Sequence, residues 1–594
     1  MKVRKLPQYA DISAVRLDEK YLGKITKNKL VSLNNNVKGK LVNKDRLEKE
    51  EGMIAVKVVR INLPHGIELE YIPGNYEIEE EAHDISSFTL NDIGREFVIH
   101  ARVEKVRQSA GPTLFTLFDG TGTISAKAFA GPGKRAFPDI KEGLAISAKI
   151  QLREYDNNLE AELVSFRIVD NKKINDKINS IADKKAEPDN TDFMISSEIL
   201  EKLRPRITEF ARIVKKAMLE SRPVIIRHHA DADGYCAGIA LERAILPKLM
   251  DLHGDPKAIW KFYKRSPLKA PFYGYSDAVK DLSHSMEESS RFGTKEPLVI
   301  IADNGSTEED ILGIRKIKVY GAKVVVLDHH YPGDKDEKGK CPVDYYADSH
   351  LNPYLEGGDM SMTAGMLAPE VARFINKDAG DIEILPALAG LGDKSECSEI
   401  KKYIKIAEDK GLTLEYMKKL VKVIDFEAHH LRFIESRELV NDLLGASMKK
   451  QKELVELIIP EISFLEKEQL KAARNYSRIE DTGKSVIARV DIEKVNRQGK
   501  YPSAGKATGM LHDSVSRESD KPVITLSLGR DFMTIRANKA EGFNVHDVIS
   551  RLREKIPHGF IDGGGHEFAG TVKFIEAARN EVMEIVNEYL EKWR

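Results

Sequence analysis

Three short apolar runs in the middle of the chain each end in an acidic segment. The runs occupy residues 223–226, 297–302 and 323–327, and the segments that follow them are RHHADADG, DNGS and DHHYP. Near-continuous valine and isoleucine favour strands buried on both faces, as in a parallel sheet covered by helices. In such sheets ligands gather beyond the carboxyl ends of the strands. The pattern therefore predicts an α/β domain whose acidic side chains converge at one sheet edge.

The connections between these runs are consistent with that arrangement. Ser306 and Glu309 have the spacing of a capping box, which predicts a helix from there to about Tyr320. Farther along the chain, the apolar stretch 384–392 ends in glycine and presents Asp393. We expect Asp393 to reach the same edge.

These segments together supply a cluster of carboxylates and imidazoles. Its members are His229, Asp231, Asp233, Asp303, Asp328, His329, His330 and Asp393. Crowded carboxylates raise one another's pKa values unless cations neutralise them. Oxygen ligands with a few imidazoles suit Mn²⁺ or Mg²⁺, the nitrogen favours manganese, and the lack of thiolate ligands argues against structural zinc. Two such ions can activate water and stabilise a leaving oxygen, so we expect hydrolysis of phosphate esters.

The order of these motifs resembles that of the DHH–DHHA1 phosphoesterase superfamily, most of all its RecJ-like single-strand-specific exonucleases. HADADG, Asp303, LDHH and GDKSE correspond in order to the family's motifs I to IV. The resemblance implies a parallel-sheet DHH domain followed by a smaller α/β DHHA1 domain. It also implies two bound ions, Mn²⁺ or Mg²⁺.

The same resemblance implies roles for individual residues. The ligands of the two ions would be, respectively, His229, Asp231 and Asp303, and Asp233, His329 and Asp393. Asp303 would bridge the ions, Asp328 would orient the site, and His330 would contact the scissile phosphate. Bacterial RecJ has aspartate at the position of His229, a departure that bears on metal preference.

The C-terminal region carries a glycine loop, IDGGGHEFAG, at residues 561–570. Glycines allow close backbone approach and can leave amides to cradle an anion. The loop resembles the signature of the DHHA1 domain, and Arg536 matches the family's phosphate-contacting arginine. The substrate-binding residues implied in this way are Arg536, Gly563, Gly564, Gly565 and His566. Asn352, in a segment similar to the family's Asn-Pro motif, would help to order the site.

The N-terminal part of the chain is rich in predicted strands. Residues 1–85 alternate apolar strands with polar turns, and residues 86–170 contain five strands with a DGTG hairpin signal. The second region resembles the OB-fold, whose second and third strands bind nucleic acid. Candidate nucleic-acid contacts are Phe115, Phe118, Lys127, Phe129, Lys134 and Arg135. Because side chains alternate along a strand, at least one of Phe115 and Phe118 is expected in the core.

The rest of the chain divides by composition and motif. Residues 171–196 are charged and indicate a linker, partly helical, and the DHH domain is expected over 197–400. Residues 401–478 form a predicted helical insert that would clamp substrate, bind a partner or simply connect. The DHHA1 domain is expected over 479–594.

The net charge is only −1, so a nucleic-acid partner would be held by local basic patches. No apolar run approaches the roughly 20 residues of a membrane span, and the N-terminus lacks a secretory signal. We expect a cytoplasmic protein with no membrane partner.

The leading hypothesis is a metal-dependent exonuclease that releases mononucleotides from single-stranded DNA or RNA, with the 3′ to 5′ direction favoured. An N-terminal barrel is similar to archaeal RecJ-like nucleases, which implies roles in DNA repair, replication or RNA processing, and a helicase or replication protein as partner. One alternative is a phosphodiesterase for oligoribonucleotides or cyclic dinucleotides. Another is an inactive nucleic-acid-binding scaffold, although the complete ligand set argues against it.

Overall fold

The computed structural model describes residues 2–6, 11–26, 30–47, 52–62, 66–74, 77–79, 82–155, 158–268, 270, 272–431, 437–496, 499–538 and 540–593. The chain forms two compact units, Met1–Ile178 and Asn179–Arg594. Among the described residues, no helix combines the length and the apolar character that crossing a bilayer requires.

The first unit begins with a seven-stranded sheet in the order β3-β4-β6-β5-β2-β1-β7. Its strands are β1 (Lys2–Arg4), β2 (Lys20–Ile25), β3 (Leu30–Ser32), β4 (Lys38–Leu41), β5 (Gly52–Asn62), β6 (Gly66–Tyr71) and β7 (Glu77–Glu79).

A closed five-stranded barrel in the order β10-β12-β11-β8-β9 follows this sheet. Its strands are β8 (Glu96–Gln108), β9 (Thr113–Phe118), β10 (Thr123–Ala128), β11 (Ala145–Tyr155) and β12 (Asn158–Ile168). The Asp119 carboxylate fixes the β9–β10 turn by accepting hydrogen bonds from the backbone amides of Thr121 (2.7 Å) and Gly122 (3.0 Å). The predicted hairpin is present, and the barrel is consistent with an OB-fold. Helix α1 (Asn171–Ala186) occupies most of the segment expected to be a linker.

The second unit contains a first lobe built on a five-stranded, wholly parallel sheet in the order β14-β13-β15-β16-β17. The strands are β13 (Val224–His228), β14 (Tyr263–Pro267), β15 (Leu298–Ala302), β16 (Lys323–Leu327) and β17 (Ser349–Leu351). Every residue of β13 and β15 is buried. The three apolar runs of the sequence are thus the three central strands, and the predicted α/β fold is confirmed.

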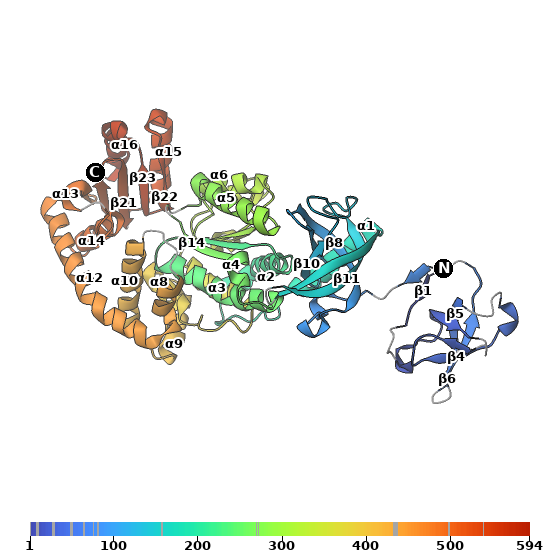
Figure 1. The fold of residues 1–594 in the computed structure, drawn as a ribbon. Coiled ribbons are helices and arrows are strands. Elements are labelled where there is room, and N and C mark those ends of the chain that lie inside the picture. The colour runs from blue at the N-terminus through green and yellow to red at the C-terminus, as the bar shows by residue number, and fades with distance from the viewer. Residues whose placement is uncertain are drawn as a thin grey trace. The chain divides into compact units, whose positions relative to one another are not determined.

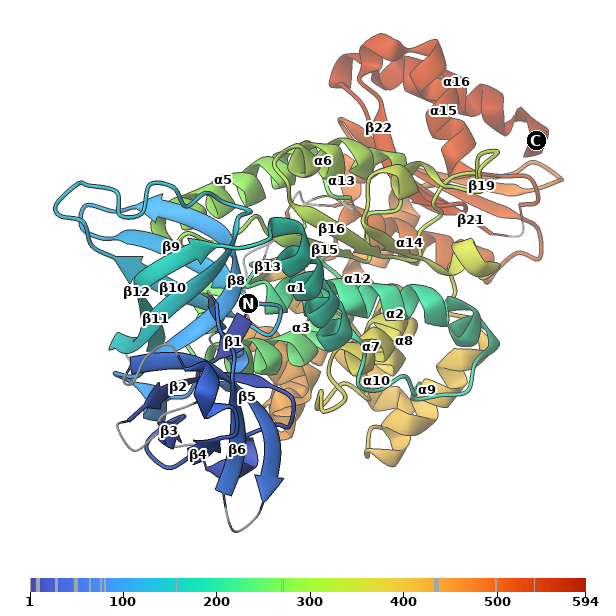
Figure 2. The same cartoon turned by 90° about the vertical axis from the view of Figure 1, so that its right-hand side faces the viewer.

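Helices cover both faces of this sheet (Figure 2). They are α2 (Glu198–Leu219), α3 (Ala232–His253), α4 (Ala258–Phe262), α5 (Tyr275–Phe292), α6 (Glu308–Val319) and α7 (Ala364–Ile375). Helix α8 (Leu385–Gly392) packs against α3 and α7. Alternate residues of the strands point to opposite faces: Ile226 and Ile300 pack with α2, α3 and α7, whereas Ile225 and Val299 pack with α5 and α6. This alternation explains why the strands are apolar throughout.

Helix α6 begins one residue later than the spacing of Ser306 and Glu309 predicts. The capping box is formed instead by Thr307 and Asp310, and the helix ends at Val319. Ser306 is already engaged, because its hydroxyl lies 2.9 Å from the His350 ring and its amide donates to Asp328.

The second lobe is built on a six-stranded mixed sheet in the order β18-β19-β20-β21-β23-β22. Its strands are β18 (Arg478–Asp481), β19 (Val486–Asp491), β20 (Val523–Leu528), β21 (Phe532–Asn538), β22 (Asp562–His566) and β23 (Ala569–Lys573). Its helices are α13 (Ile492–Val495), α14 (Ala504–Ser516), α15 (Val545–Lys555) and α16 (Arg579–Leu590). Helices α15 and α16 pack on one face of the sheet, and α14 packs on the other.

Helices connect the two lobes (Figure 1). They are α9 (Ser398–Asp409), α10 (Leu414–Leu431), α11 (Arg437–Asn441) and the long α12 (Met448–Tyr476). Helix α12 packs against α10 and extends to α14 and β19 of the second lobe.

A buried ion pair connects strand β13 to helix α5. Arg227 of β13 is 5% exposed and donates to the fully buried Asp281 of α5, with Nε 3.0 Å from Oδ2. The hydroxyl of Tyr273 donates to the same carboxylate at 3.0 Å. Each charge is compensated only while its partner is present.

Replacing Asp281 with alanine would leave the Arg227 guanidinium charged and unpaired inside the protein. We expect the Asp281→Ala variant to lose roughly 3–5 kcal/mol in the free energy of unfolding of this unit. Urea unfolding followed by circular dichroism measures the loss. The control is Glu198→Ala, which removes an exposed ion pair with Lys202 and should leave the transition unchanged. An unaltered midpoint for Asp281→Ala would contradict the assigned role.

Candidate metal centre

The register of the parallel sheet brings polar residues to one edge. Strands β13, β15, β16 and β17 end level with one another, because His228 pairs with Ala302, Ala302 with Leu327, and Leu327 with Leu351. The next residues along the four strands are His229, Asp303, Asp328 and Asn352. Equal strand endings thus account for four of the side chains that the sequence singles out.

The turn that follows β15 has unusual backbone geometry. Asp303 has a φ of 56° and Gly305 has a φ of 106°. A non-glycine residue in the left-handed region costs about 1–3 kcal/mol and is found mainly at functional sites. The turn places the Asp303 carboxylate between the two groups of side chains described next.

The first group consists of His229, Asp231 and Asp303. His229 Nδ1 lies 2.8 Å from Asp231 Oδ2 and 3.7 Å from Asp303 Oδ2. Asp231 caps α3 by accepting a hydrogen bond from the Gly234 amide at 3.0 Å. A helix cap therefore fixes the backbone that carries one carboxylate of this group.

The second group consists of Asp233, His329 and Asp393. His329 Nε2 lies 3.9 Å from Asp233 Oδ2, 3.3 Å from Asp393 Oδ2 and 3.3 Å from Asp303 Oδ1. His329 Nδ1 lies 2.7 Å from the carbonyl oxygen of Met360, which can only accept a hydrogen bond. In the neutral ring the proton therefore sits on Nδ1, and Nε2 offers its lone pair to the group.

The carboxylates of this cluster oppose one another's ionisation. Burial raises the pKa of Asp233 well above its ordinary value, and the charges of Asp303 and Asp393 raise it further. Burial also raises the pKa of Asp393, to about 7, although His329 acts in the opposite direction. A cation would relieve this repulsion.

Several atoms that could bind a metal ion have no hydrogen-bond partner in the part of the chain that the structure describes. Asp233 Oδ2, Asp303 Oδ2 and His329 Nε2 are buried without a hydrogen-bond partner among the described residues. Unpaired oxygen and imidazole acceptors that face a shared space are costly unless something binds them. Their chemistry fits a divalent cation that takes oxygen and nitrogen ligands.

Asp328 holds the adjacent loop in place by accepting hydrogen bonds from it. Its Oδ1 accepts hydrogen bonds from the backbone amide of His329 (2.8 Å) and from Nδ1 of His330 (2.8 Å), and its Oδ2 accepts from the Ser306 amide (3.0 Å). Burial alone would raise its pKa, but the His330 charge and hydrogen bonds hold the pKa of Asp328 well below its usual range. The same pairing raises the pKa of the His330 imidazole against the effect of burial.

A hydrogen-bond network that the sequence did not suggest lies beneath this loop. The Asn352 side chain is fully buried and donates to the His330 carbonyl oxygen (2.8 Å) and the Ser306 hydroxyl (2.9 Å). The Ser306 hydroxyl in turn lies 2.9 Å from His350 Nε2, and His350 Nδ1 lies 2.7 Å from Asp344. Only Asn352 was predicted as a site residue, through the Asn-Pro segment. Ser306 was expected only to cap the following helix, and nothing in the sequence marked His350 or Asp344.

The second lobe reaches the cluster through the glycine strand β22. The His566 ring stacks on the His330 ring with centroids 4.5 Å apart and planes 4° apart. Burial, and then the charges of His330 and His329, lower the pKa of His566 well below its usual value. The neutral ring of His566 therefore stacks on the more basic ring of His330.

The predicted glycines lie in the same strand, and at two of them a side chain would not fit. A Cβ at Gly563 would lie 2.5 Å from the Thr571 carbonyl oxygen, and a Cβ at Gly565, whose φ is 132°, would lie 2.4 Å from that of Ala569. Gly564 has open space except for Glu309, 3.9 Å away. Arg536 of β21 pairs with Ala569 of β23, and its guanidinium donates to the Ile535 carbonyl oxygen at 3.0 Å.

The barrel residues separate into two classes. Phe115 and Phe118 are both fully buried, so neither ring offers a face to a base. Phe115 packs in the barrel core, whereas Phe118 is buried although it lies outside that core, with the Arg102 guanidinium 5.5 Å from the centre of its ring. Phe129 is 69% exposed in the segment after β10, where Lys134 and Arg135 are exposed as well.

Lys127 already interacts with other residues of the barrel. It forms an ion pair with Glu160 and lies 4.0 Å from the centre of the Tyr155 ring. Tyr155 is 64% exposed and was not among the predicted contacts, because it lies at the end of a strand without a sequence signal.

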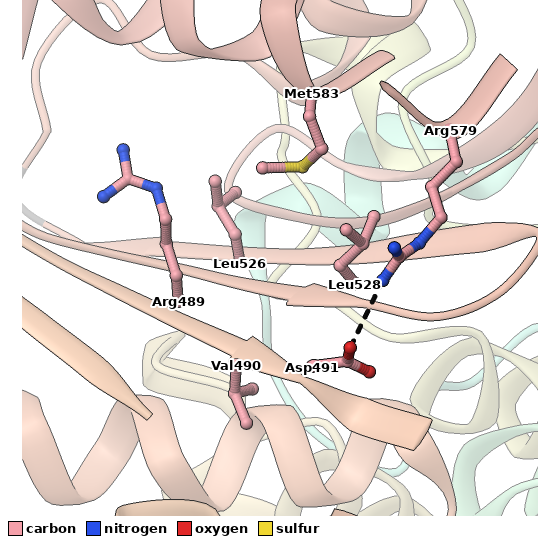
Figure 3. A pocket seen from close by; sticks show the side chains of 7 residues that line it. All are labelled: Arg489, Val490, Asp491, Leu526, Leu528, Arg579 and Met583. Atoms are coloured by element: carbon pink, nitrogen blue, oxygen red, sulfur yellow. Dashed lines mark hydrogen bonds and ion pairs between the residues drawn. The ribbon is translucent and has the colours of Figure 1, made fainter. Parts of the chain in front are cut away.

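A separate pocket of about 160 Å³ lies in the second lobe between the sheet and α16 (Figure 3). Its lining is Arg489, Val490, Asp491, Leu526, Leu528, Arg579 and Met583. Asp491 and Arg579 form an ion pair at 3.4 Å across it. None of the predicted site residues lines this pocket.

The chain matches known proteins over most of its length. Residues 223–389 match the family model described as DHH family, N-terminal domain. An uncharacterised protein of Methanocaldococcus jannaschii is 40% identical over 553 residues, which cover 87% of this chain and 72% of that protein.

Solved structures are similar as well. The DHH domain of a protein described as a member of a family of ribosomal proteins is 39% identical with a TM-score of 0.68, over 71% of this chain and 99% of that one. RecJ from Thermus thermophilus in complex with Mn²⁺ is 14% identical with a TM-score of 0.45, over 69% of this chain and 57% of that one. The family match, the extensive identity to the M. jannaschii protein and the motifs at the sheet edge agree: this chain belongs to the DHH family.

Proposed function

We propose that this protein is a divalent-metal-dependent phosphodiesterase that degrades single-stranded nucleic acid from an end and releases mononucleotides. The observation that carries the proposal is that two side-chain groups lie next to each other, with Asp303 of the first group 3.3 Å from His329 of the second, and leave buried oxygen and nitrogen acceptors without protein partners among the described residues. Such a pair favours two cations over one, since each group has its own three possible ligands.

The ligands would be His229, Asp231 and Asp303 for one ion, and Asp233, His329 and Asp393 for the other. Mn²⁺ is the favoured metal because each group contains an imidazole beside carboxylates. When bound, divalent cations would polarise a phosphoryl oxygen and increase the acidity of a water molecule.

The side chains around this cluster suit an anionic substrate. Asp328 occupies Nδ1 of His330 and raises its pKa, which leaves Nε2 to donate a hydrogen bond to a phosphate oxygen. Burial of the neighbouring His566 keeps that ring neutral, so the two stacked rings do not repel each other. Arg536 and the side-chain-free strand Gly563–Gly565 would hold the nucleotide beside the cleaved bond.

The barrel would guide long strands toward an enzyme of this kind. Phe129 offers an exposed aromatic surface, and Lys134 and Arg135 add positive charge in the same segment. Base stacking with neighbouring backbone contacts is how such barrels bind single strands without sequence preference. Because one relative is described as belonging to a ribosomal protein family, RNA is as relevant a substrate as DNA.

Two other functions are the outcomes against which this proposal is tested. A phosphodiesterase for short oligoribonucleotides or cyclic dinucleotides would use the same cluster without the barrel. A binding scaffold would need neither the cations nor the strained Asp303.

Of the predictions about function, the first concerns Asp303. Asp303→Asn removes the negative charge of the carboxylate that lies between the two groups, so it should lower the rate of strand hydrolysis by at least about a thousandfold while leaving binding of the strand within a few-fold. DNA and RNA single strands labelled at either the 5′ or the 3′ end, with Mn²⁺ or with EDTA, measure the rate and the direction, for which we expect 3′ to 5′.

Asp520→Asn, which alters an exposed carboxylate of the second lobe, is the matched control and should behave as the wild type. Hydrolysis of the strand by Asp303→Asn at the wild-type rate would contradict the proposal. No cleavage of long strands by the wild-type protein, with cleavage of dinucleotides, would support the short-substrate function.

The second prediction concerns pH. Asp393 has a pKa of about 7, and the pKa values of Asp233, His229 and His329 are raised well above their ordinary values, so a cation must displace protons to bind. Affinity for Mn²⁺ should therefore increase as pH rises from 5.5 to 8, by up to roughly tenfold per pH unit for each displaced proton. Isothermal titration calorimetry in buffers of different ionisation enthalpy measures both the affinity for Mn²⁺ and the number of protons released on binding. An affinity that does not change over this range would contradict the assigned ligands.

The third prediction separates long from short substrates. Phe129→Ala should weaken binding of a long single strand by about 1–3 kcal/mol if the ring stacks on a base, and should leave hydrolysis of dinucleotides unchanged. Lys141→Ala, at another exposed position in the barrel, is the control. Equal loss on both substrates would count against a guiding role for the barrel.

A further inference from the structure

Helix α10, which lies between the two lobes in sequence, supplies a carboxylate to the first turn of α3. Asp425 Oδ1 accepts a hydrogen bond from the backbone amide of Ala232 at 3.1 Å. Ala232 stands between Asp231 and Asp233, one from each of the two groups in the cluster. Asp425 therefore holds the backbone that separates the two carboxylates.

The packing around this contact leaves little room for the turn to move. A Cβ at Gly392 would lie 3.0 Å from the Ala232 side chain and 3.7 Å from Val421 of α10. Gly392 directly precedes Asp393. Helix α10 is thus in close contact with the segments that carry three of the proposed ligands.

The second lobe contacts the same carboxylate. Lys506, in the first turn of α14, places its Nζ 3.5 Å from Asp425 Oδ2 and 3.6 Å from Glu466 Oε1 of α12. The Tyr501 hydroxyl donates to Glu466 at 3.2 Å, and the Lys506 ammonium lies 5.0 Å from the centre of the Tyr501 ring. A chain of contacts therefore runs from the second lobe through Lys506 and Asp425 to the Ala232 amide.

We propose that Asp425 is a positioning residue for the metal ligands, and that Lys506 couples the substrate-gripping second lobe to them through it. One oxygen of Asp425 fixes the turn between Asp231 and Asp233, while the other faces Lys506. Movement of the second lobe away from the cluster would break the ion pair between Lys506 and Asp425. It would thereby remove one restraint on the turn Asp231–Asp233. This inference rests on the proposed function, since it deepens the account of the same site.

Neutral and truncated variants separate the two parts of this role. Asp425→Asn keeps an oxygen that can accept from Ala232 but loses the charge that attracts Lys506, whereas Asp425→Ala loses both. Lys506→Met removes the ion pairs with Asp425 and Glu466 but leaves the hydrogen bond between Asp425 and Ala232 intact. Glu415→Gln, an exposed position near the start of α10, is the matched control.

Binding of Mn²⁺ to the full-length protein, measured by isothermal titration calorimetry, tests the positioning role without reference to turnover. Loss of a group that orients metal ligands typically weakens affinity roughly 10- to 100-fold. We expect that loss for Asp425→Ala, near wild-type affinity for Asp425→Asn and Lys506→Met, and no change for Glu415→Gln. Wild-type affinity in a folded Asp425→Ala variant would overturn the positioning role.

Hydrolysis of a labelled single strand at saturating Mn²⁺ tests the coupling. Asp425→Asn and Lys506→Met should each lower kcat/KM by roughly tenfold, and the double variant should be no slower than either alone, because both remove one contact. Multiplied effects in the double variant would overturn the coupling. This comparison decides the matter even where Asp425→Ala fails to fold.

Failure of this inference differs visibly from failure of the proposed function. If the wild-type protein neither binds Mn²⁺ nor cleaves a strand, the proposed function is wrong. If the wild-type protein does both and the Asp425 and Lys506 variants match it, only the inference drawn from α10 is wrong.

Discussion

Repulsion among carboxylates held at one sheet edge is the constraint on which the rest of this structure depends. Four parallel strands end at the same level, so the residues that follow them cannot avoid one another. Burial prevents water from screening their charges, and the raised pKa values of Asp233 and Asp393 reflect the free energy needed to ionise these carboxyl groups there. A fold that keeps such an edge must either protonate it or neutralise it with cations.

The surrounding structure holds this edge in place with polar contacts rather than apolar ones. Asp328 accepts from two backbone amides of its neighbours and from the His330 ring, and Asn352 ties the same loop to Ser306. The Met360 carbonyl fixes the proton of His329 on the nitrogen that faces away from the cluster. These contacts orient the acceptors that the protein itself leaves unpaired among the described residues.

The site is completed by residues that lie far away in the sequence. His566 stacks on His330, and Arg553 of α15 pairs with Glu309 of α6 at 2.7 Å, so two independent contacts hold the second lobe against the first. Helix α10 adds Asp425 from a third direction. A substrate bound by the second lobe would therefore be positioned relative to the turn Asp231–Asp233 by side-chain contacts between the lobes, and not by the parallel sheet.

The sequence by itself determined the family, the parallel sheet and the membership of the cluster, because each β-branched run is followed at once by its acidic residues. Strand periodicity and turn chemistry are local properties, and they fix which residues end a strand. Long-range packing is not local, and so the tertiary structure alone decided the rest. It buried Phe115 in the barrel core and Phe118 outside that core, moved the α6 cap from Ser306 to Thr307 because His350 and Asp328 engage that serine, and brought Asp425 and Lys506 close to the first turn of α3. None of these contacts leaves a spacing in the sequence, because their partners come from separate elements whose approach is set by how the lobes pack.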